Sequence, residues 1–206
     1  METEKLNEFL YELLETEEGG VKIYEAALQS AQEDDLKEEW EKYHEQTKNH
    51  VDQARQLLEQ FGLDSEKDTP GRKVLRHIAE SLVKAIEMAR EAGDPDAAEI
   101  VAAECVELAE SKDHHNWELL GMVAEKLKGD EKKMVMEIQK QIEDEEDEHY
   151  FHRRGWGREL HLQALGLKAV LPPPEEKKDV KTATAAARAE KAAHPKSSRK
   201  TGYEHS

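Results

Sequence analysis

The segment IEDEEDEHYFH, residues 142–152, lies inside a long helical pattern of this chain. Glu146 and His149 fall on the same 3.5-residue stripe as Ile138 and Trp156, so both polar side chains point toward the apolar side of the helix. A charged side chain in such a position is costly unless it is paired or bound to a metal. The Glu-x-x-His spacing also places both side chains where they can contact one ion. A metal held there would need further ligands from other parts of the chain.

The composition is that of an acidic helical protein. The chain has 206 residues, of which 37% are charged, and it carries little glycine or proline outside its C-terminal segment, which favours an all-α fold. The net charge of -17 is uneven, because residues 171–206 contain eight Lys or Arg and only five Asp or Glu. An acidic body is suited to cation capture and does not bind nucleic acid by counterion release. Nucleic-acid binding is therefore expected only if the basic tail provides it.

Cysteine content and hydropathy indicate the compartment. Cys105 is the single cysteine, which excludes an internal disulfide and fits a reducing environment. No apolar run approaches the ~20 residues of a membrane span, and residues 1–4 lack the basic and apolar regions of a signal peptide. The chain also has no Gly-rich phosphate loop and no paired-cysteine motif. We expect a cytoplasmic protein that does not bind membranes.

Two helices, residues 5–31 and 36–62, are predicted to form an antiparallel hairpin, because only a short polar turn separates them. Glu17 interrupts the apolar stripe of the first helix, and His50 takes a core position in the second. Residues at equal distance from the turn lie side by side, which places Glu17 level with His50. His44, which forms a Glu-x-x-His motif with Glu41, is the alternative ligand on this helix.

The second half of the chain predicts a similar hairpin, with helices at residues 96–127 and 131–165. Before it, a turn-rich connection and a shorter amphipathic helix at residues 73–92 are expected to form a long crossover. Reflection through the turn near residue 129 places Glu110 level with His149. The sequence therefore predicts a bundle over residues 1–170. The tail, residues 171–206, begins with three prolines and is expected to be disordered, with nascent helix possible at 182–193.

Core-facing acids and imidazoles thus come from all four long helices. The di-iron carboxylate sites of four-helix bundles take Glu from two helices and Glu-x-x-His from the other two, and mixed oxygen and imidazole ligation suits iron or manganese. The candidate metal ligands are Glu17, His50, Glu107, Glu110, Glu146 and His149.

At this point the sequence resembles the ferritin-like superfamily. More narrowly, it is similar to the bacterial branch of small ferritin-like stress-associated proteins, which have an extra helix between the second and third bundle helices. The resemblance covers residues 6–165. It rests on Glu17, the segment HEQTKNH at 44–50, the segments DAAEI and VELAE between 96 and 110, and EDEH at 146–149.

The resemblance implies an antiparallel four-helix bundle with an extra short helix in the crossover, a di-iron or dimanganese site, and a small homo-oligomer such as a dimer. It implies a role in iron binding and oxidation or in peroxide detoxification under stress, as in ferroxidase- or peroxidase-like proteins. The chain departs from the family at Gln46 and Thr47, where glutamate is usual, so one carboxylate is missing or Glu45 replaces it. The alternative is a metal-free helical bundle that serves as a stress-related binding module.

Overall fold

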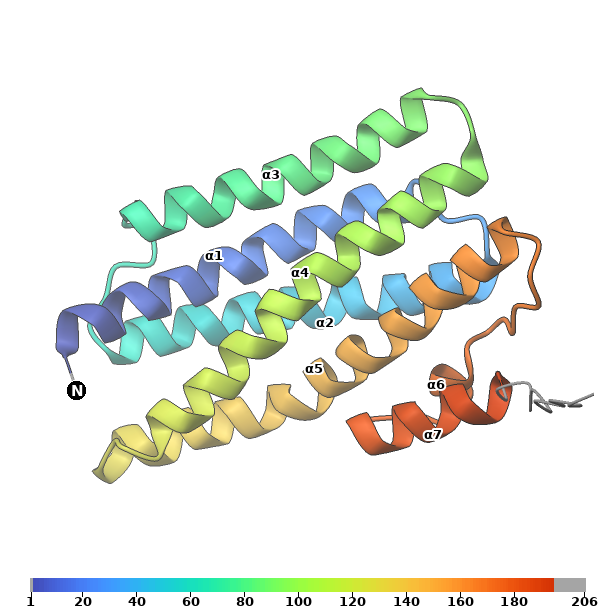
Figure 1. Cartoon of the computed structure of the whole chain (residues 1–206). Coiled ribbons are helices and arrows are strands. Elements are labelled where there is room, and N and C mark those ends of the chain that lie inside the picture. Colours follow the sequence, from blue (N-terminus) through green and yellow to red (C-terminus); the bar gives the residue numbers. More distant parts are fainter. Residues whose placement is uncertain (1, 195–206) are drawn as a thin grey trace, which may run out of the picture.

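The computed structural model describes residues 2–194, and within that range the chain is helical with no strand. None of the described helices is long and apolar enough to cross a membrane. The all-α prediction is confirmed, and the five long helices begin and end within a few residues of the predicted positions. In chain order the elements are α1 (Thr3–Leu28), α2 (Asp34–Gln60), α3 (Pro70–Glu91), α4 (Pro95–Ala124), α5 (Gly129–Ala164), α6 (Pro174–Lys177) and α7 (Ala183–Ala193) (Figure 1).

Helices α1 and α4 lie side by side and run in opposite directions. The Trp117 side chain contacts Glu17 and the Tyr24 side chain contacts Glu110, so a step toward the C-terminus in α1 is a step toward the N-terminus in α4. Glu17 and Tyr24 are seven residues apart in α1, and Glu110 and Trp117 are seven residues apart in α4, which is two turns in each helix. Both contacts therefore lie along one continuous face between the two helices.

Helices α2 and α5 are antiparallel in the same way. Trp156 contacts Glu39 near one end of this face, and His50 contacts Glu145 further along it. Since α1 is antiparallel to both α2 and α4, these two helices run in the same direction. Their connection must return along the length of the bundle, and α3 makes that return (Figure 1).

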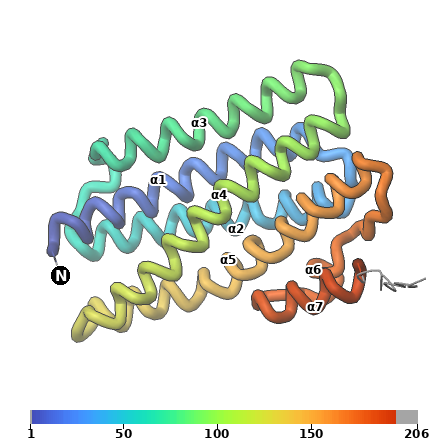
Figure 2. Tube along the Cα trace, in the orientation of Figure 1, coloured from blue at the N-terminus to red at the C-terminus, as the bar shows by residue number. Residues whose placement is uncertain are grey.

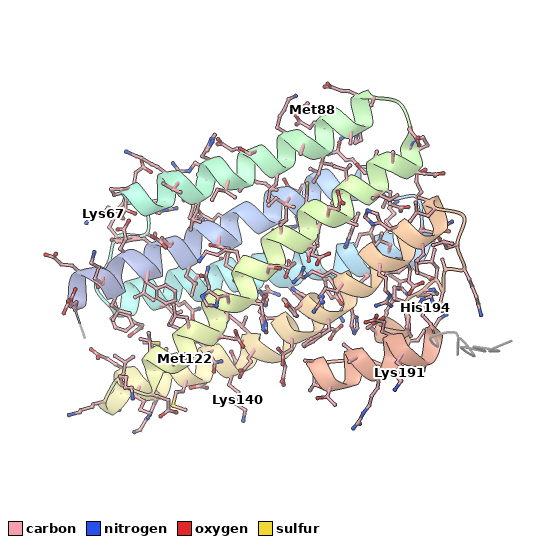
Figure 3. The ribbon with its side chains drawn as sticks, in the orientation of Figure 1. Lys67, Met88, Met122, Lys140, Lys191 and His194 are labelled. Carbon is pink, nitrogen blue, oxygen red and sulfur yellow. The ribbon has the colours of Figure 1, made fainter. Side chains whose placement is uncertain are left out.

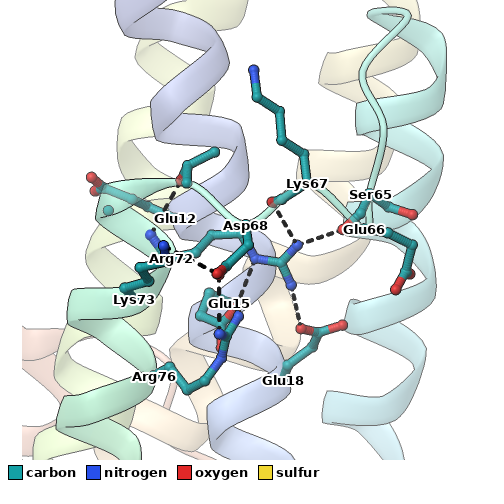
Figure 4. Close-up of polar contacts among 12 residues, drawn as sticks. Glu12, Glu15, Glu18, Ser65, Glu66, Lys67, Asp68, Arg72, Lys73 and Arg76 are labelled. Carbon is teal, nitrogen blue, oxygen red and sulfur yellow. Dashed lines mark hydrogen bonds and ion pairs between the residues drawn. The ribbon is translucent and has the colours of Figure 1, made fainter.

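The crossover helix α3 lies where a helix was predicted at residues 73–92. It has 22 residues, against 26 in α1, and it packs along α1 and α4. The buried carboxylate of Glu15 accepts hydrogen bonds from Arg72 at 2.7 Å and from Arg76 at 2.8 Å, which fixes the start of α3 against α1 (Figure 4). A Cβ atom on Gly19 would lie 2.7 Å from the Cβ of Ala79, so glycine allows the two helices to approach closely.

The apolar core is divided into two clusters along the bundle. One is built around Leu13, Leu57 and Trp117, and the other around Trp40 and Trp156. In each of the four bundle helices, the boundary between the clusters falls at the polar stripe positions singled out in the sequence. A layer of ionisable side chains therefore crosses the middle of the bundle, with apolar packing on both sides. The predicted core role of Trp40, Trp117 and Trp156 is confirmed, because each is 2% exposed or less.

The segment after residue 170 differs from the expected disordered tail over its described part. Helices α6 and α7 lie against α5 (Figure 2). Arg158 holds Glu175 through two hydrogen bonds of 2.8 and 2.9 Å, and Val180 and Ala189 pack on Phe151. An ion pair and small side chains hold the segment against α5. Its low apolar content did not predict these contacts. Helix α7 matches the nascent helix considered at 182–193, and the part of the expected disordered tail from residue 195 onward lies outside the described residues.

Candidate metal centre

Five of the six predicted ligands meet in the polar layer at the middle of the bundle. All five are buried, with exposed fractions between 0% and 3%. Side-chain nitrogen and oxygen atoms are visible in the space between α4 and α5 at this height (Figure 3). The five residues are Glu17 from α1, His50 from α2, Glu110 from α4, and Glu146 and His149 from α5.

The five side chains form two groups that share Glu146, each compact enough to hold a metal ion. In the first group, His50 Nδ1 lies 3.1 Å from Glu146 Oε1 and 3.8 Å from Glu17 Oε2. In the second, His149 Nδ1 lies 3.5 Å from Glu146 Oε1 and 3.4 Å from Glu110 Oε2. Each hairpin therefore supplies one glutamate and one imidazole, and Glu146 lies between them.

Both imidazoles are held from outside by their Nε2 atoms. His149 Nε2 lies 3.0 Å from Gln46 Oε1, and His50 Nε2 lies 2.9 Å from Glu145 Oε2. Because those oxygens accept hydrogen bonds, each Nε2 carries a hydrogen and donates it. Each Nδ1 atom faces Glu146 as an ion-pair contact and makes no well-directed hydrogen bond within residues 2–194. A histidine that ligates a metal is commonly oriented in this way, with its second ring nitrogen bonded to an outer acceptor.

The carboxylates of Glu17 and Glu110 show the same division between an outer and an inner atom. Trp117 Nε1–H donates to Glu17 Oε1 at 2.6 Å, and the Tyr24 hydroxyl donates to Glu110 Oε1 at 2.7 Å. Within the described part of the chain, the second oxygen of each carboxylate is buried without a hydrogen-bond partner, and so are both oxygens of Glu146. Buried polar atoms are nearly always hydrogen-bonded, so this many free atoms directed at one place require an explanation.

Asp113 belongs to the same layer, although it was not among the predicted ligands. It is 4% exposed, its Oδ1 has no hydrogen-bond partner, and its charge raises the pKa of Glu17. The reflection that placed Glu110 level with His149 also placed Asp113 level with Glu146, and this signal could have identified it. Asp113 adds a carboxylate from α4 to this layer, to which α2 contributes the imidazole of His50.

Two other candidates lie elsewhere. The Glu107 side chain is 40% exposed and lies 3.9 Å from Arg153, outside both groups. His44, the alternative to His50, contacts Glu25 and Glu45 near the surface. The preference for His50 over His44 therefore agrees with the geometry, whereas the pairing of Glu107 with Glu110 at one centre does not.

Protons compensate the charge of the centre when no cation is bound. Burial lowers the pKa of His149, but the charges and contacts of Glu110 and Glu146 outweigh this and raise it to about 10. Burial likewise lowers the pKa of His50, and contacts with Glu145 and Glu146 raise it to about 9. For Glu146 itself, burial raises the pKa, yet the two imidazoles bring it down to about 2. Glu146 is thus a buried carboxylate between two imidazolium rings.

Glu17 and Asp113 hold their protons instead. Burial raises the pKa of Glu17 well above its usual range, and the charges of Asp113 and Glu146 raise it further. Burial and the charges of Glu146 and Glu110 raise the pKa of Asp113 in the same way. The side chains can therefore exchange protons for cations, since a metal ligand must be deprotonated.

Comparison with family models, with curated proteins and with solved structures finds no match for this chain. What the centre can do is therefore argued from its own chemistry. Buried carboxylates and neutral imidazoles form an oxygen-rich donor set, which suits iron, manganese or zinc better than copper(I) or an iron–sulfur cluster, because those require thiolates. Cys105, the only thiol of the chain, lies in the apolar cluster around Trp40 and Trp156 and not in this layer.

Proposed function

We propose that this protein binds a pair of iron or manganese ions at the middle of its helical bundle, as the ferritin-like di-metal carboxylate proteins do. Glu146 lies in both groups of candidate ligands and would be shared by the two ions. Glu17 and His50 would hold one ion, and Glu110 and His149 would hold the other. Asp113 supplies a further carboxylate next to Glu17.

One observation carries the proposal: the outer atoms of four side chains are hydrogen-bonded, while their inner atoms make no well-directed hydrogen bond within residues 2–194 and converge on one centre. The outer partners of Glu17, Glu110, His50 and His149 are four different side chains from four helices. A set of acids and imidazoles that only neutralised each other would direct good hydrogen bonds inward as well. The inner atoms are instead arranged as ligands around a common centre.

The chain's own residues define what the centre can do. A bound pair of iron or manganese ions supplies redox chemistry toward dioxygen or peroxide. The apolar clusters on both sides exclude bulk water from the layer. Tyr24 and Trp117 orient the carboxylates, while Gln46 and Glu145 select the ring nitrogen that faces inward. Glu17 and Asp113 hold protons that are released when they become ligands.

Metal content of the purified protein tests the proposal. We expect about two Fe or Mn ions per chain after anaerobic loading and desalting, and strong loss of both in Glu146→Ala because both groups include this residue. His149→Ala should lose one ion or weaken it. Glu107→Gln is the matched control, since it removes one acid of α4 outside both groups and should retain the metal. Equal and negligible metal in all four proteins would contradict the proposal and favour a metal-free binding module.

Proton release provides a second readout. Because metal binding must remove protons from His50, His149, Glu17 and Asp113, loading at pH 7 in weak buffer should acidify the solution by more than one proton per ion. Bound metal should also raise the thermal midpoint, by an amount corresponding to ~3 kcal/mol when the free ion is a hundredfold above Kd. Binding without proton release would show that the ion is held elsewhere on the acidic surface.

A further inference from the structure

A second group of unpaired polar atoms lies outside the buried centre, in a cavity of about 500 Å³ between α2, α5 and the α6 segment. Six carboxylates and one ammonium group line this cavity. Acidic surfaces are common without any ligand, so this charge alone assigns no site. The distinguishing feature is that two of the lining side chains, Glu39 and His152, are 7% and 3% exposed and have unpaired atoms.

The unpaired atoms are Glu39 Oε1, His152 Nε2 and Glu176 Oε2. The other end of each of the two buried side chains is held. Trp156 Nε1–H donates to Glu39 Oε2 at 2.7 Å, and His152 Nδ1 lies 3.0 Å from the Tyr43 hydroxyl. Glu39 Oε1 lies 3.8 Å from His152 Nδ1, which is too far for a hydrogen bond.

We propose that Glu39, His152 and Glu176 bind a second kind of cation, a hydrated divalent first-row ion, at this cavity. An imidazole with two carboxylates suits zinc, cobalt, iron(II) or manganese. The three side chains do not form one of the compact groups found in residues 2–194, so water completes the coordination and the ion is held less tightly than at the buried centre.

The protonation of His152 is compatible with this role. Burial lowers its pKa, which keeps the ring neutral near pH 7, as a ligand must be. The Tyr43 hydroxyl can accept from Nδ1–H, and Nε2 is then free to bind an ion, with its orientation set by Tyr43. The Tyr43 ring lies against His149, with ring centroids 4.0 Å apart. This ring separates the cavity from the buried centre, so the two sites are distinct.

Glu176 reaches the cavity because its segment is anchored. The neighbouring Glu175 is 2% exposed and accepts two hydrogen bonds from Arg158. The other acids of the cavity are less suited to bind an ion. Glu148, for example, is already paired with Lys42 and Lys181. Without a cation, Glu39 and Glu176 face each other as two carboxylates, and burial together with the charge of Glu176 raises the pKa of Glu39 to about 8. A shared proton and a bound cation are therefore the two ways to satisfy this pair.

Cobalt(II) titration of the whole chain, followed by calorimetry and visible absorption, tests the proposal. The background is Glu146→Ala, in which the buried centre is disabled, so binding at the cavity is seen alone whether or not the buried centre takes metal. We expect one cobalt ion per chain in this background, and at least a tenfold loss of affinity when Glu176→Gln or His152→Gln is added. Glu38→Gln is the control, because it removes an exposed carboxylate from the rim of the same cavity and should change affinity less than twofold.

Two results would overturn the proposal. One is the absence of stoichiometric cobalt binding in Glu146→Ala at pH 8, where the Glu39 proton no longer competes fully. The other is equal cobalt affinity in Glu176→Gln, His152→Gln and Glu38→Gln. That result would mean that cobalt is attracted diffusely to the acidic rim and that Glu39 and Glu176 share a proton instead of binding a cation. Failure of the buried centre to bind iron or manganese would leave both readouts unchanged.

Discussion

The ion pairs that hold α3 against α1 permit a prediction with an ordered set of magnitudes. Glu15 is 2% exposed and is contacted by Arg72, at 6% side-chain exposure, and by Arg76, at 35% (Figure 4). Removing one partner of a buried ion pair costs about 3–5 kcal/mol, because the other charge stays buried without compensation. Arg72 keeps its ion pair with Glu18 at 2.7 Å and Glu15→Gln keeps one acceptor oxygen, so we expect a loss at the lower end, about 3 kcal/mol in the free energy of unfolding.

Replacing either arginine should lower the free energy of unfolding by less than Glu15→Gln does, and for a different reason in each case. If Arg76 is replaced by Met, Glu15 keeps Arg72, and the lost pair is half solvated and contributes about 1 kcal/mol or less. If Arg72 is replaced by Met, Glu15 keeps two hydrogen bonds from Arg76, but the carbonyl oxygens of Ser65 and Lys67 lose their donor, which gives an intermediate loss of about 2 kcal/mol.

Urea denaturation followed by circular dichroism, in the presence of a chelator, measures all three variants. Glu41→Gln, an exposed acid in the first third of α2, is the control and should lie within about 0.5 kcal/mol of the unaltered protein. The reasoning is refuted if Glu15→Gln also lies within that range, or if Arg76→Met costs as much as Glu15→Gln. Either result would mean that solvent, and not the partner side chain, compensates these charges.

Two further predictions concern the buried acids outside and inside the centre. Since the pKa of Glu39 is about 8 in the folded chain and 4.5 is its ordinary value, the folded state holds a proton that the unfolded state has lost, and stability falls as pH rises from 4.5 to 8. The fall amounts to at most about 5 kcal/mol, at ~1.4 kcal/mol per pH unit, and Glu39→Gln should remove it. Urea unfolding of both proteins at pH 5 and pH 8 measures the difference. Parallel pH profiles of stability for the two proteins would contradict the prediction. Trp117→Phe leaves Glu17 Oε1 without its donor, so we expect a loss of about 1–3 kcal/mol in chemical denaturation and weaker metal binding, whereas unchanged values for both would show that the indole only fills space.

Periodicity was sufficient to predict the helices and most of the centre. Glu17 and His50 were identified because each interrupts an apolar stripe, and reflection through a short turn paired each with its neighbour on the next helix. This works because antiparallel helices joined by short turns have a register that the turn defines. Packing between α1 and α4, and between α2 and α5, involves no such turn. The contacts of Tyr24 with Glu110 and of His50 with Glu145 were therefore not predicted.

The error at Glu107 and the omission of Asp113 have a common cause. Glu107, Glu110 and Asp113 are three residues apart, and each step of three turns the side chain by about 60° around the helix axis. Which two of the three face the centre depends on how α4 is rotated against its neighbours, and the sequence pattern of one helix does not define that rotation. In the structure α4 is rotated so that Glu110 and Asp113 face inward and Glu107 faces Arg153.

The layer of ionisable groups divides the core of the bundle into two apolar clusters. Buried ion pairs are often replaced by apolar residues without loss of stability, so a chain that required only stability would gain little from this layer. Protons and mutual pairing reduce the cost of the layer without a metal, but free inner atoms on Glu17, Glu110 and Glu146 remain unsatisfied. A cation that binds these atoms returns its binding free energy to the fold, because the unfolded chain does not assemble the site. Stability and metal binding are therefore coupled through the same side chains, and in a chelator the protein should unfold first around this layer.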